Sequence, residues 1–225
     1  MISAIIPVYN EKNYILKTIN TVLKENLIDE IIIVDDASND GSTEILKSFS
    51  HPKVKIIYSE KNKGKGSAIK IGLNKCKSPL VLIQDADLEY DPTDIKDLYQ
   101  PFINSKVDVV YGSRFISSKP RRVVYFKNFL ANKVLSFLVN FLIDKNFSDV
   151  MCGYKLIRTD LLKKLNLEEN GFAIEIEITM KLSKLKSIFY EVGISYYGRT
   201  IEEGKKIRFI DALKCLYSSF KYFFK

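Results

Sequence analysis

Short apolar runs, each followed by a polar loop and a helix-like pattern, recur through the first half of the chain. They span residues 3–8, 30–34, 54–58 and 80–83, and the second reads Ile-Ile-Ile-Val. Strands that are apolar on both faces belong to sheets covered on both sides, and strand–helix alternation builds such sheets from parallel strands. We therefore predict an α/β fold with a Rossmann-like, mostly parallel sheet flanked by helices. Further strands are expected at 107–111 and 188–194.

A length of 225 residues suits one main domain with appendages. We expect that domain at 1–206, with an apolar and basic helical segment inserted at 119–147, and an amphipathic helix at 207–225. The three widely spaced cysteines argue against a disulfide framework and against a zinc site. The first apolar run is short and broken by Pro7, so we expect no signal peptide. No segment reads as apolar enough to span a bilayer.

Three acids follow the apolar run at 80–83, namely Asp85, Asp87 and Glu89. Ligands of open α/β sheets bind at the carboxyl ends of the strands. Neighbouring carboxylates repel each other unless a cation lies between them, and their oxygens suit Mg²⁺ or Mn²⁺. A strand that simply ends in a polar turn is the alternative. Polar residues that end the first two strands favour a site, because they share this sheet edge: Tyr9, Glu11, Asp35 and Asp36.

A glycine loop, Gly64-Lys65-Gly66, follows the third strand and precedes a helix. Its backbone N–H groups can cradle a phosphate, or the loop can be no more than a basic helix entrance. A dinucleotide fingerprint needs a third glycine where Ile69 stands, which argues against a NAD site. Arg114 follows the fifth strand and can bind phosphate bidentately, the alternative being a surface arginine.

The stretch 109–143 contains no carboxylate but six basic residues, in a chain of net charge +8 that favours an anionic partner. From 125 onward it is apolar except at every fourth position: Asn128, Asn132, Ser136, Asn140 and Asp144. This predicts one or two helices with a wide apolar surface that lies in a membrane interface, with Arg121 and Arg122 among the headgroups. Packing under the sheet or in a dimer is the alternative. The segment 196–206 is polar and basic and is expected to be a mobile loop.

Taken together, the chain resembles family-2 glycosyltransferases of the GT-A fold. It is most similar to polyprenyl-phosphate sugar synthases of the dolichyl-phosphate mannose synthase type. The resemblance covers essentially the whole chain, and the matching segments follow in order: 6–11, 34–41, 64–66, 85–87, 112–114, 149–155, 191–199 and 204–206. Two motifs depart from the family pattern. Asp-Pro-Thr-Ser-Gly-Phe becomes Asp-Val-Met-Cys-Gly-Tyr at 149–154, and Glu-Val-Pro-Ile becomes Glu-Val-Gly-Ile at 191–194, without loss of a charged group.

The resemblance implies a role for each matching residue. The nucleoside is expected to be held by Pro7, Tyr9, Glu11, Val34 and Asp36. The sugar nucleotide and its Mg²⁺ or Mn²⁺ are expected on Asp85, Asp87 and Glu89, with the Ala86 backbone alongside. Donor phosphate is expected to contact Arg114, which acts with the two aspartates in catalysis. The acceptor phosphate is expected on Arg121 or Arg122, and the diphosphate is to be covered by Arg199 and Lys205.

The implied activity is inverting transfer of a hexose from GDP-mannose or UDP-glucose to a polyprenyl phosphate, by a protein peripheral to the cytoplasmic membrane face. A phosphate monoester has a second pKa of about 6 and is already anionic at neutral pH, so it needs no general base. This suits a chain whose single histidine, His51, lies in a turn-like stretch. A hydroxyl acceptor needs a base, for which Asp149 and Glu175 are the candidates.

Three other functions stay open on the sequence. One is a transferase of the same fold that acts on a glycan or glycolipid hydroxyl. Another is an Asp-x-Asp phosphatase, although its acids follow the first strand and not the fourth. The third is a non-catalytic scaffold on a membrane surface. Nucleic-acid binding is disfavoured, because the basic residues accompany a long apolar stretch and no stacking platform. The oligomeric state is not predicted.

Overall fold

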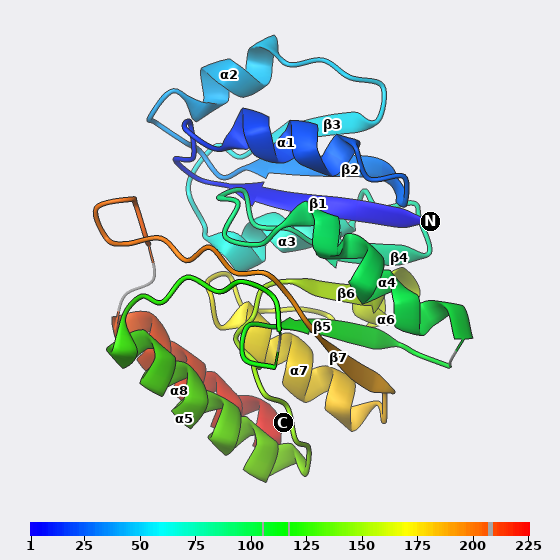
Figure 1. Cartoon of the computed structure of the whole chain (residues 1–225), viewed down its shortest axis with the longest axis vertical. Helices are drawn as coiled ribbons and strands as arrows, with labels where there is room; N and C mark the ends of the chain where they lie inside the picture. Colours follow the sequence, from blue (N-terminus) through cyan, green and yellow to red (C-terminus); the bar gives the residue numbers. More distant parts are fainter. Residues whose placement is uncertain (105, 117, 207–208) are drawn as a thin grey trace.

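A computed structural model describes residues 1–104, 106–116, 118–206 and 209–225 and confirms the predicted α/β fold. Figure 1 shows one sheet between layers of helices. The strands are β1 (Ile2–Val8), β2 (Ile28–Asp35), β3 (Val54–Tyr58), β4 (Leu80–Ile83), β5 (Val109–Ser113), β6 (Lys155–Arg158) and β7 (Phe189–Gly193). The helices are α1 (Ile15–Leu23), α2 (Ser42–Ser48), α3 (Lys65–Leu73), α4 (Ile95–Asn104), α5 (Phe126–Ile143), α6 (Thr159–Lys164), α7 (Ile174–Lys184) and α8 (Phe209–Phe224), with a 3₁₀ turn at Pro92–Asp94.

The sheet has seven strands in the order β3-β2-β1-β4-β6-β5-β7. The pairs β3–β2, β2–β1, β1–β4 and β5–β7 are parallel, as predicted, whereas β6 runs antiparallel to both of its neighbours. The sequence did not predict β6, because its four residues begin and end with a base and look like a helix start. The strand pairs with β4 and β5, and its Lys155, at 0% exposure, has an acid partner inside the protein.

Two apolar layers fill the space on either side of the sheet. One layer joins alternate sheet residues to α1, α2 and α4. The other joins the opposite residues to α3 and α7, and the outer pair α5 and α8 covers α7. The contact between α3 and β1 is tight enough to require a glycine, since a Cβ on Gly72 would lie 2.7 Å from a methyl of Ile5. This packing brings the carboxyl ends of β1, β2 and β4 to one edge.

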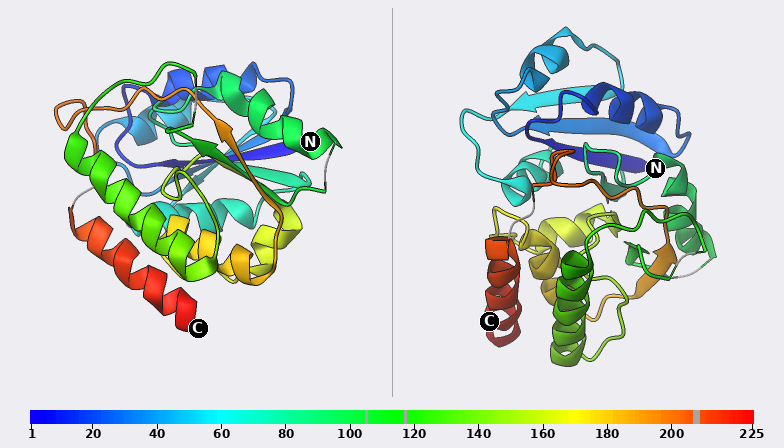
Figure 2. Two further views of the ribbon diagram at one scale, coloured as in Figure 1. Left: turned by 60° about the horizontal axis from the view of Figure 1, so that its bottom comes forward. Right: turned by 60° about the vertical axis from the view of Figure 1, so that its left-hand side comes forward.

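The predicted apolar segment forms a single helix, α5, that lies beside α8 (Figure 2). The middle of its polar stripe faces the protein: the Asn140 amide bonds both the N–H and the C=O of Phe147, and the Ser136 hydroxyl accepts from the Val150 N–H. Asn128 and Asp144, at the two ends of the stripe, are exposed. Leu135 and Val139 are buried in the core, but many other apolar side chains of α5 face outward, as do many of α8. This α5–α8 surface consists of Phe126, Phe129, Leu130, Val134, Phe137 and Phe141 with Ile210, Leu213, Leu216, Tyr217, Phe220, Phe223 and Phe224.

One detail of this region differs from the sequence prediction. By length and composition alone, α5 could cross a membrane, because its polar positions are uncharged apart from two lysines. It is the one such helix in the part of the chain that the structure describes. The predicted C-terminal helix corresponds to α8, which is described from Phe209; Ile207 and Arg208, where the prediction began, lie outside the described residues.

Candidate active site

The loops that follow β1 and β2 are tied to each other by side-chain hydrogen bonds. The Glu11 N–H donates to the Ser42 hydroxyl at 2.8 Å, and the Asn10 N–H donates to Ser38 at 3.0 Å. Asp35 accepts from the Ser38 N–H and from a threonine hydroxyl, so it holds its own turn. These hydrogen bonds therefore hold the ends of β1 and β2 together beside β4.

The residues predicted to hold the nucleoside do not all present a side chain at these strand ends. Pro7 and Tyr9 are half-buried at the end of β1, whereas the side chain of Val34 is fully buried in the core. The Asp36 carboxylate accepts from the N–H groups of Lys63 and Gly64, at 3.0 and 2.6 Å. In this structure Asp36 thus fastens the glycine loop to the end of β2.

The Asp-x-Asp pair carries a cation on each acid. The Lys65 ammonium lies 2.7 Å from Asp85, and the Arg199 guanidinium lies 2.7 Å from Asp87. Between them, Ala86 is buried, and its carbonyl accepts from a threonine of α1. Burial raises the pKa of Asp85, and Lys65 opposes that rise. Burial and the neighbouring Glu89 raise the pKa of Asp87, and Arg199 opposes it. Each acid is thereby held beside one matched base.

Arg199 belongs to a segment, residues 196–206, that we call the strap. The strap crosses the end of β1 and is drawn in orange in Figure 1. The Arg199 guanidinium makes two hydrogen bonds to Glu11, at 2.8 and 3.0 Å, in addition to its bond to Asp87. Lys206 also pairs with Glu11 at 2.5 Å, and Lys205 lies 4.0 Å from Glu89. The predicted loop cations therefore lie among the predicted acids.

Glu89 is held by the same strap. Its carboxylate accepts from the Arg199 N–H at 2.8 Å and from the Tyr196 hydroxyl at 2.9 Å. The oxygens of Asp87 and Glu89 are the donor type that Mg²⁺ and Mn²⁺ prefer, so the residues present fit such an ion. No trio of acid, cysteine or histidine groups is arranged around an ion position among the described residues. A metal ion on Asp87 would compete with the guanidinium for this carboxylate.

The guanidinium of Arg114, which was predicted to contact donor phosphate, is already paired with an acid. It makes a bidentate pair with Asp149, with both side-chain bonds at 2.7 Å, and its own N–H also donates to that carboxylate. Asp149 is fully buried, and the pair is stacked beside the rings of Phe115 and Tyr196. Glu191 holds this turn from β7 by accepting from the Asp149 N–H. Arg114 is therefore fixed in place by its acid.

The two arginines predicted for the acceptor phosphate differ in their surroundings. Arg122 pairs with the exposed Glu203 at 2.7 Å. Arg121 instead stacks on Phe115, 5.6 Å from the ring centre, and has no acid partner among the described residues. The ammonium of Lys133 lies 4.2 Å from the centre of the same ring and likewise pairs with no acid in the described part of the chain. Lys133 was not predicted, although it stands in the carboxylate-free stretch.

Neither candidate general base is free. Asp149 is taken by Arg114, and Glu175 lies between Lys65, at 3.1 Å, and Lys155, which it contacts closely. Burial raises the pKa of Glu175, but the two lysines outweigh burial and the pKa is lowered. Both acids are nearly inaccessible to solvent. An acid that is buried, ionised and paired with lysines is poorly suited to take a proton from a substrate.

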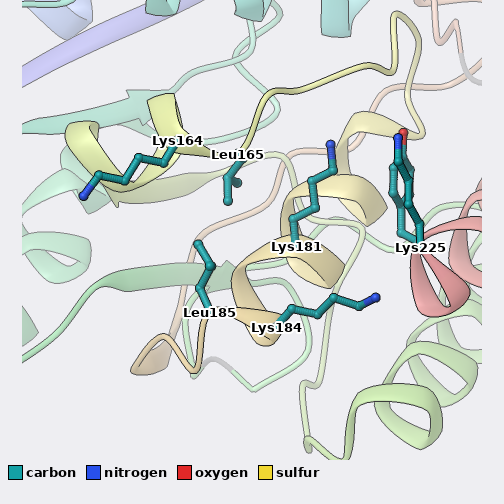
Figure 3. A pocket seen from close by; sticks show the side chains of 7 residues that line it. Lys164, Leu165, Lys181, Lys184, Leu185 and Lys225 are labelled. Atoms are coloured by element: carbon teal, nitrogen blue, oxygen red, sulfur yellow. The ribbon is translucent and has the colours of Figure 1, made fainter.

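A separate pocket of about 220 Å³ lies where α6, α7 and α8 meet, and Figure 3 shows it. Lys164 and Lys184 point in opposite directions in this view, whereas Lys181 and Lys225 both contact the carboxylate of Glu168. Lys184 donates to a backbone carbonyl, Lys181 pairs with Glu177, and Lys225 pairs with Glu168. This pocket has no acid pair of the kind found at β4.

Comparison with known proteins identifies the family. The profile of Glycosyl transferase family 2 matches residues 3–166. An uncharacterised protein of Methanocaldococcus jannaschii is 31% identical over 88% of this chain and 90% of its own length. Dolichol-phosphate mannosyltransferase of Pyrococcus furiosus is 28% identical over 92% of this chain, which spans 60% of that protein. A UDP-N-acetylglucosamine–dolichyl-phosphate N-acetylglucosaminyltransferase of Methanococcus voltae is 32% identical over 74% of this chain and 72% of its own length.

Solved structures agree on the fold. Glucosyl-3-phosphoglycerate synthase from Mycobacterium tuberculosis, in complex with Mn²⁺, UDP-glucose and phosphoglyceric acid, superposes with a TM-score of 0.75. The match covers 99% of this chain and 79% of that one, at 16% identity. The predicted GT-A fold and the predicted enzyme class are thus confirmed. The chain belongs to glycosyl transferase family 2.

Proposed function

We propose that the protein transfers a hexose from a nucleotide sugar to a polyprenyl phosphate at a membrane surface, with inversion at the sugar. One observation supports a phosphate as the acceptor. Both acids that could serve as a base are sealed in buried ion pairs, while Arg121 and Lys133 lie over Phe115 with no acid partner in the described part of the chain. A site with spare cations and no free base suits an acceptor that arrives already ionised.

The donor is a nucleoside diphosphate sugar, with GDP-mannose and UDP-glucose as the leading pair. The names of the Pyrococcus and Methanococcus relatives and the UDP-glucose bound in the Mycobacterium enzyme support this class. Asp87 and Glu89 would hold Mg²⁺ or Mn²⁺, which supplies positive charge to the leaving diphosphate. Arg199 and Lys205, once released from the acids, would bind the same diphosphate from the strap.

The transfer step needs no proton transfer. An oxygen of the acceptor phosphate forms a bond to the anomeric carbon as the bond from that carbon to the diphosphate oxygen breaks. The electron pair leaves with the nucleoside diphosphate, whose charge is met by the cations of the donor site. Arg121 and Lys133 hold the attacking phosphate on the opposite side. Attack and departure on opposite faces invert the anomeric configuration.

The membrane side of the proposal rests on the α5–α8 surface. Phe137 and Phe141 of α5 are 73% and 77% exposed, and Phe224 of α8 is 80% exposed. Contiguous exposed apolar surface of this kind marks a contact with lipid or with a partner. The basic residues at the start of α5 favour lipid, because cations beside an apolar helix face suit anionic headgroups. With Ser136 and Asn140 of α5 turned toward the protein, α5 would lie along the cytoplasmic membrane face.

Family membership removes the phosphatase and scaffold alternatives, and the hydroxyl acceptor becomes an outcome of the test. Labelled GDP-mannose and UDP-glucose are each incubated with the protein, Mn²⁺, and either a short polyprenyl phosphate or the matching polyprenol. We expect label in the organic phase with the phosphate alone. Transfer to the polyprenol or to an added glycan would refute the proposal.

Variants then assign the acceptor site. Losing the charge-assisted contacts of Arg121 and Lys133 removes about 1.5–3 kcal/mol each, so R121A/K133A is expected to weaken use of the polyprenyl phosphate roughly a hundredfold or more. Binding of nucleoside diphosphate is expected to stay unchanged. R122A is the matched control, because Arg122 is already paired with Glu203. Equal losses in R122A and R121A/K133A would contradict the assignment.

A further inference from the structure

A continuous row of four buried charges runs from the first acid of the Asp-x-Asp pair into the protein. The Lys65 ammonium bridges Asp85, at 2.7 Å, and Glu175, at 3.1 Å. Glu175 in turn contacts Lys155 closely. The Lys155 ammonium ends the row by donating to the carbonyl of Cys152 at 2.5 Å and to a second carbonyl, two residues earlier, at 3.2 Å.

The row is balanced and becomes more buried with depth. Exposure of the side chains falls from 23% at Asp85 through 11% at Lys65 and 2% at Glu175 to 0% at Lys155. Burial lowers the pKa of Lys65, but Asp85 and Glu175 outweigh burial and the pKa is raised, so Lys65 stays cationic. Two acids alternate with two bases, and removal of any one would leave a buried charge without its partner.

The backbone around Lys65 leaves this side chain little freedom. A Cβ on Gly64 or Gly66 would lie 2.6 or 2.5 Å from a carbonyl oxygen of the 169–170 loop, so both glycines are locked against that loop. A Cβ on Gly153 would lie 2.6 Å from the Lys65 ammonium and 3.0 Å from Asp85. The loop therefore holds Lys65 against Asp85, and its lysine does not project toward a phosphate.

The far end of the row reaches the other half of the site. The carbonyls that Lys155 binds belong to the turn at 149–152, and that turn begins with Asp149, the partner of Arg114. One set of buried charges thus connects the acid on the donor side with the seat of Arg114. We propose that Lys65 and Glu175 are positioning residues for sugar transfer, which keep Asp85 and Arg114 at a fixed separation. The proposal rests on the family and not on the identity of the acceptor.

The test compares K65M, E175Q and the double variant K65M/E175Q. Each single variant leaves an unbalanced buried charge, whereas the double variant leaves one acid, Asp85, and one base, Lys155. Thermal denaturation is expected to show a lower Tm in both single variants and a partial recovery in the double variant. Turnover is followed as nucleoside diphosphate release from GDP-mannose or UDP-glucose, with Mn²⁺ present. We expect kcat to fall about 100-fold in K65M, as for a misplacement of about 1 Å, and to stay low in the double variant.

The KM for the donor and the affinity for nucleoside diphosphate are expected to stay within about threefold of wild type, because the row touches the donor only through Asp85. K181M is the matched control: Lys181 pairs at 2.6 Å with Glu177, a fully buried acid on the same helix. It is expected to lower Tm without changing kcat. Recovery of kcat together with Tm in the double variant would show that the row contributes only to stability, which would overturn the proposal. A large loss of nucleotide affinity in K65M would make Lys65 a direct ligand and would also overturn the proposal.

Discussion

Replacement of Arg199 by methionine should change metal binding in opposite directions with and without nucleotide. In the structure its guanidinium bonds Glu11 twice and Asp87 once, and it lies 3.7 Å from Glu89. Three acids, Glu11, Asp87 and Glu89, therefore face three strap cations, and the cluster is neutral without any metal. Methionine keeps the aliphatic volume but leaves the cluster with one unmatched negative charge.

The magnitude follows from the bond to Asp87. A hydrogen bond between charged groups contributes about 1.5–3 kcal/mol, and each 1.4 kcal/mol is a factor of about ten. A metal ion that no longer competes with the guanidinium should thus bind roughly ten- to a hundredfold more tightly. With a nucleoside diphosphate present, the same cation is needed on the phosphates, and its loss should weaken nucleotide binding by a similar factor.

Mn²⁺ binding is measured by electron paramagnetic resonance, which reports free ion directly, first alone and then with GDP or UDP. R199M should bind Mn²⁺ alone more tightly than wild type and Mn²⁺-nucleotide more weakly. R122M, which removes an exposed arginine paired with Glu203, should change neither. Weaker binding of Mn²⁺ alone in R199M would show that the guanidinium does not occupy the metal position.

Two further predictions concern the membrane face and the core. The double variant F137S/F141S removes two side chains of the α5–α8 surface that are 73% and 77% exposed, and each is worth about 1.5–3 kcal/mol when buried in lipid. Sedimentation with anionic vesicles should drop sharply while Tm stays constant; unchanged sedimentation would contradict lipid contact. G72A places a Cβ 2.7 Å from a methyl of Ile5 and should cost about 1–3 kcal/mol, seen as a Tm lower by several degrees. A wild-type Tm would show that α3 can move away from β1.

The strand ends were predictable because their signal is local. An apolar run followed at once by acids specifies both the strand and the edge where the acids lie, and β1, β2 and β4 bear this out. The four residues of β6 carry no such signal, since the groups that satisfy the buried Lys155, namely Glu175 and two backbone carbonyls, lie outside the strand. The pattern of α5 indicated a helix and a narrow polar stripe, but not that Ser136 and Asn140 of this stripe would face the protein. That orientation depends on the backbone of 147–150, which the stripe binds.

The residues of the candidate site were predictable, whereas their partners were not. Arg199 and Glu11 are 188 positions apart, and nothing local to either one indicates the pairing. The same holds for Arg114 with Asp149, which were expected to serve different substrates. Ion pairs of this kind form when a fold brings distant segments together, and motif positions alone do not reveal them. The structure thus shows what the motifs do not: the acids and bases of the site pair with each other.

Because these charges are paired, the cations of the site that have no acid partner among the described residues are candidates to bind a substrate. Lys65, Arg114 and Arg199 each have at least one carboxylate within 2.8 Å. Arg121 and Lys133, which stack on the ring of Phe115, pair with no acid in the described part of the chain, and Lys133 also donates to the carbonyl of Ser148. A cation over an aromatic ring gains about 0.5–1 kcal/mol at an exposed position, less than a carboxylate or phosphate partner would supply. Under the proposed function, Arg121 and Lys133 therefore remain available to the phosphate of a lipid acceptor, next to the exposed apolar surface of α5.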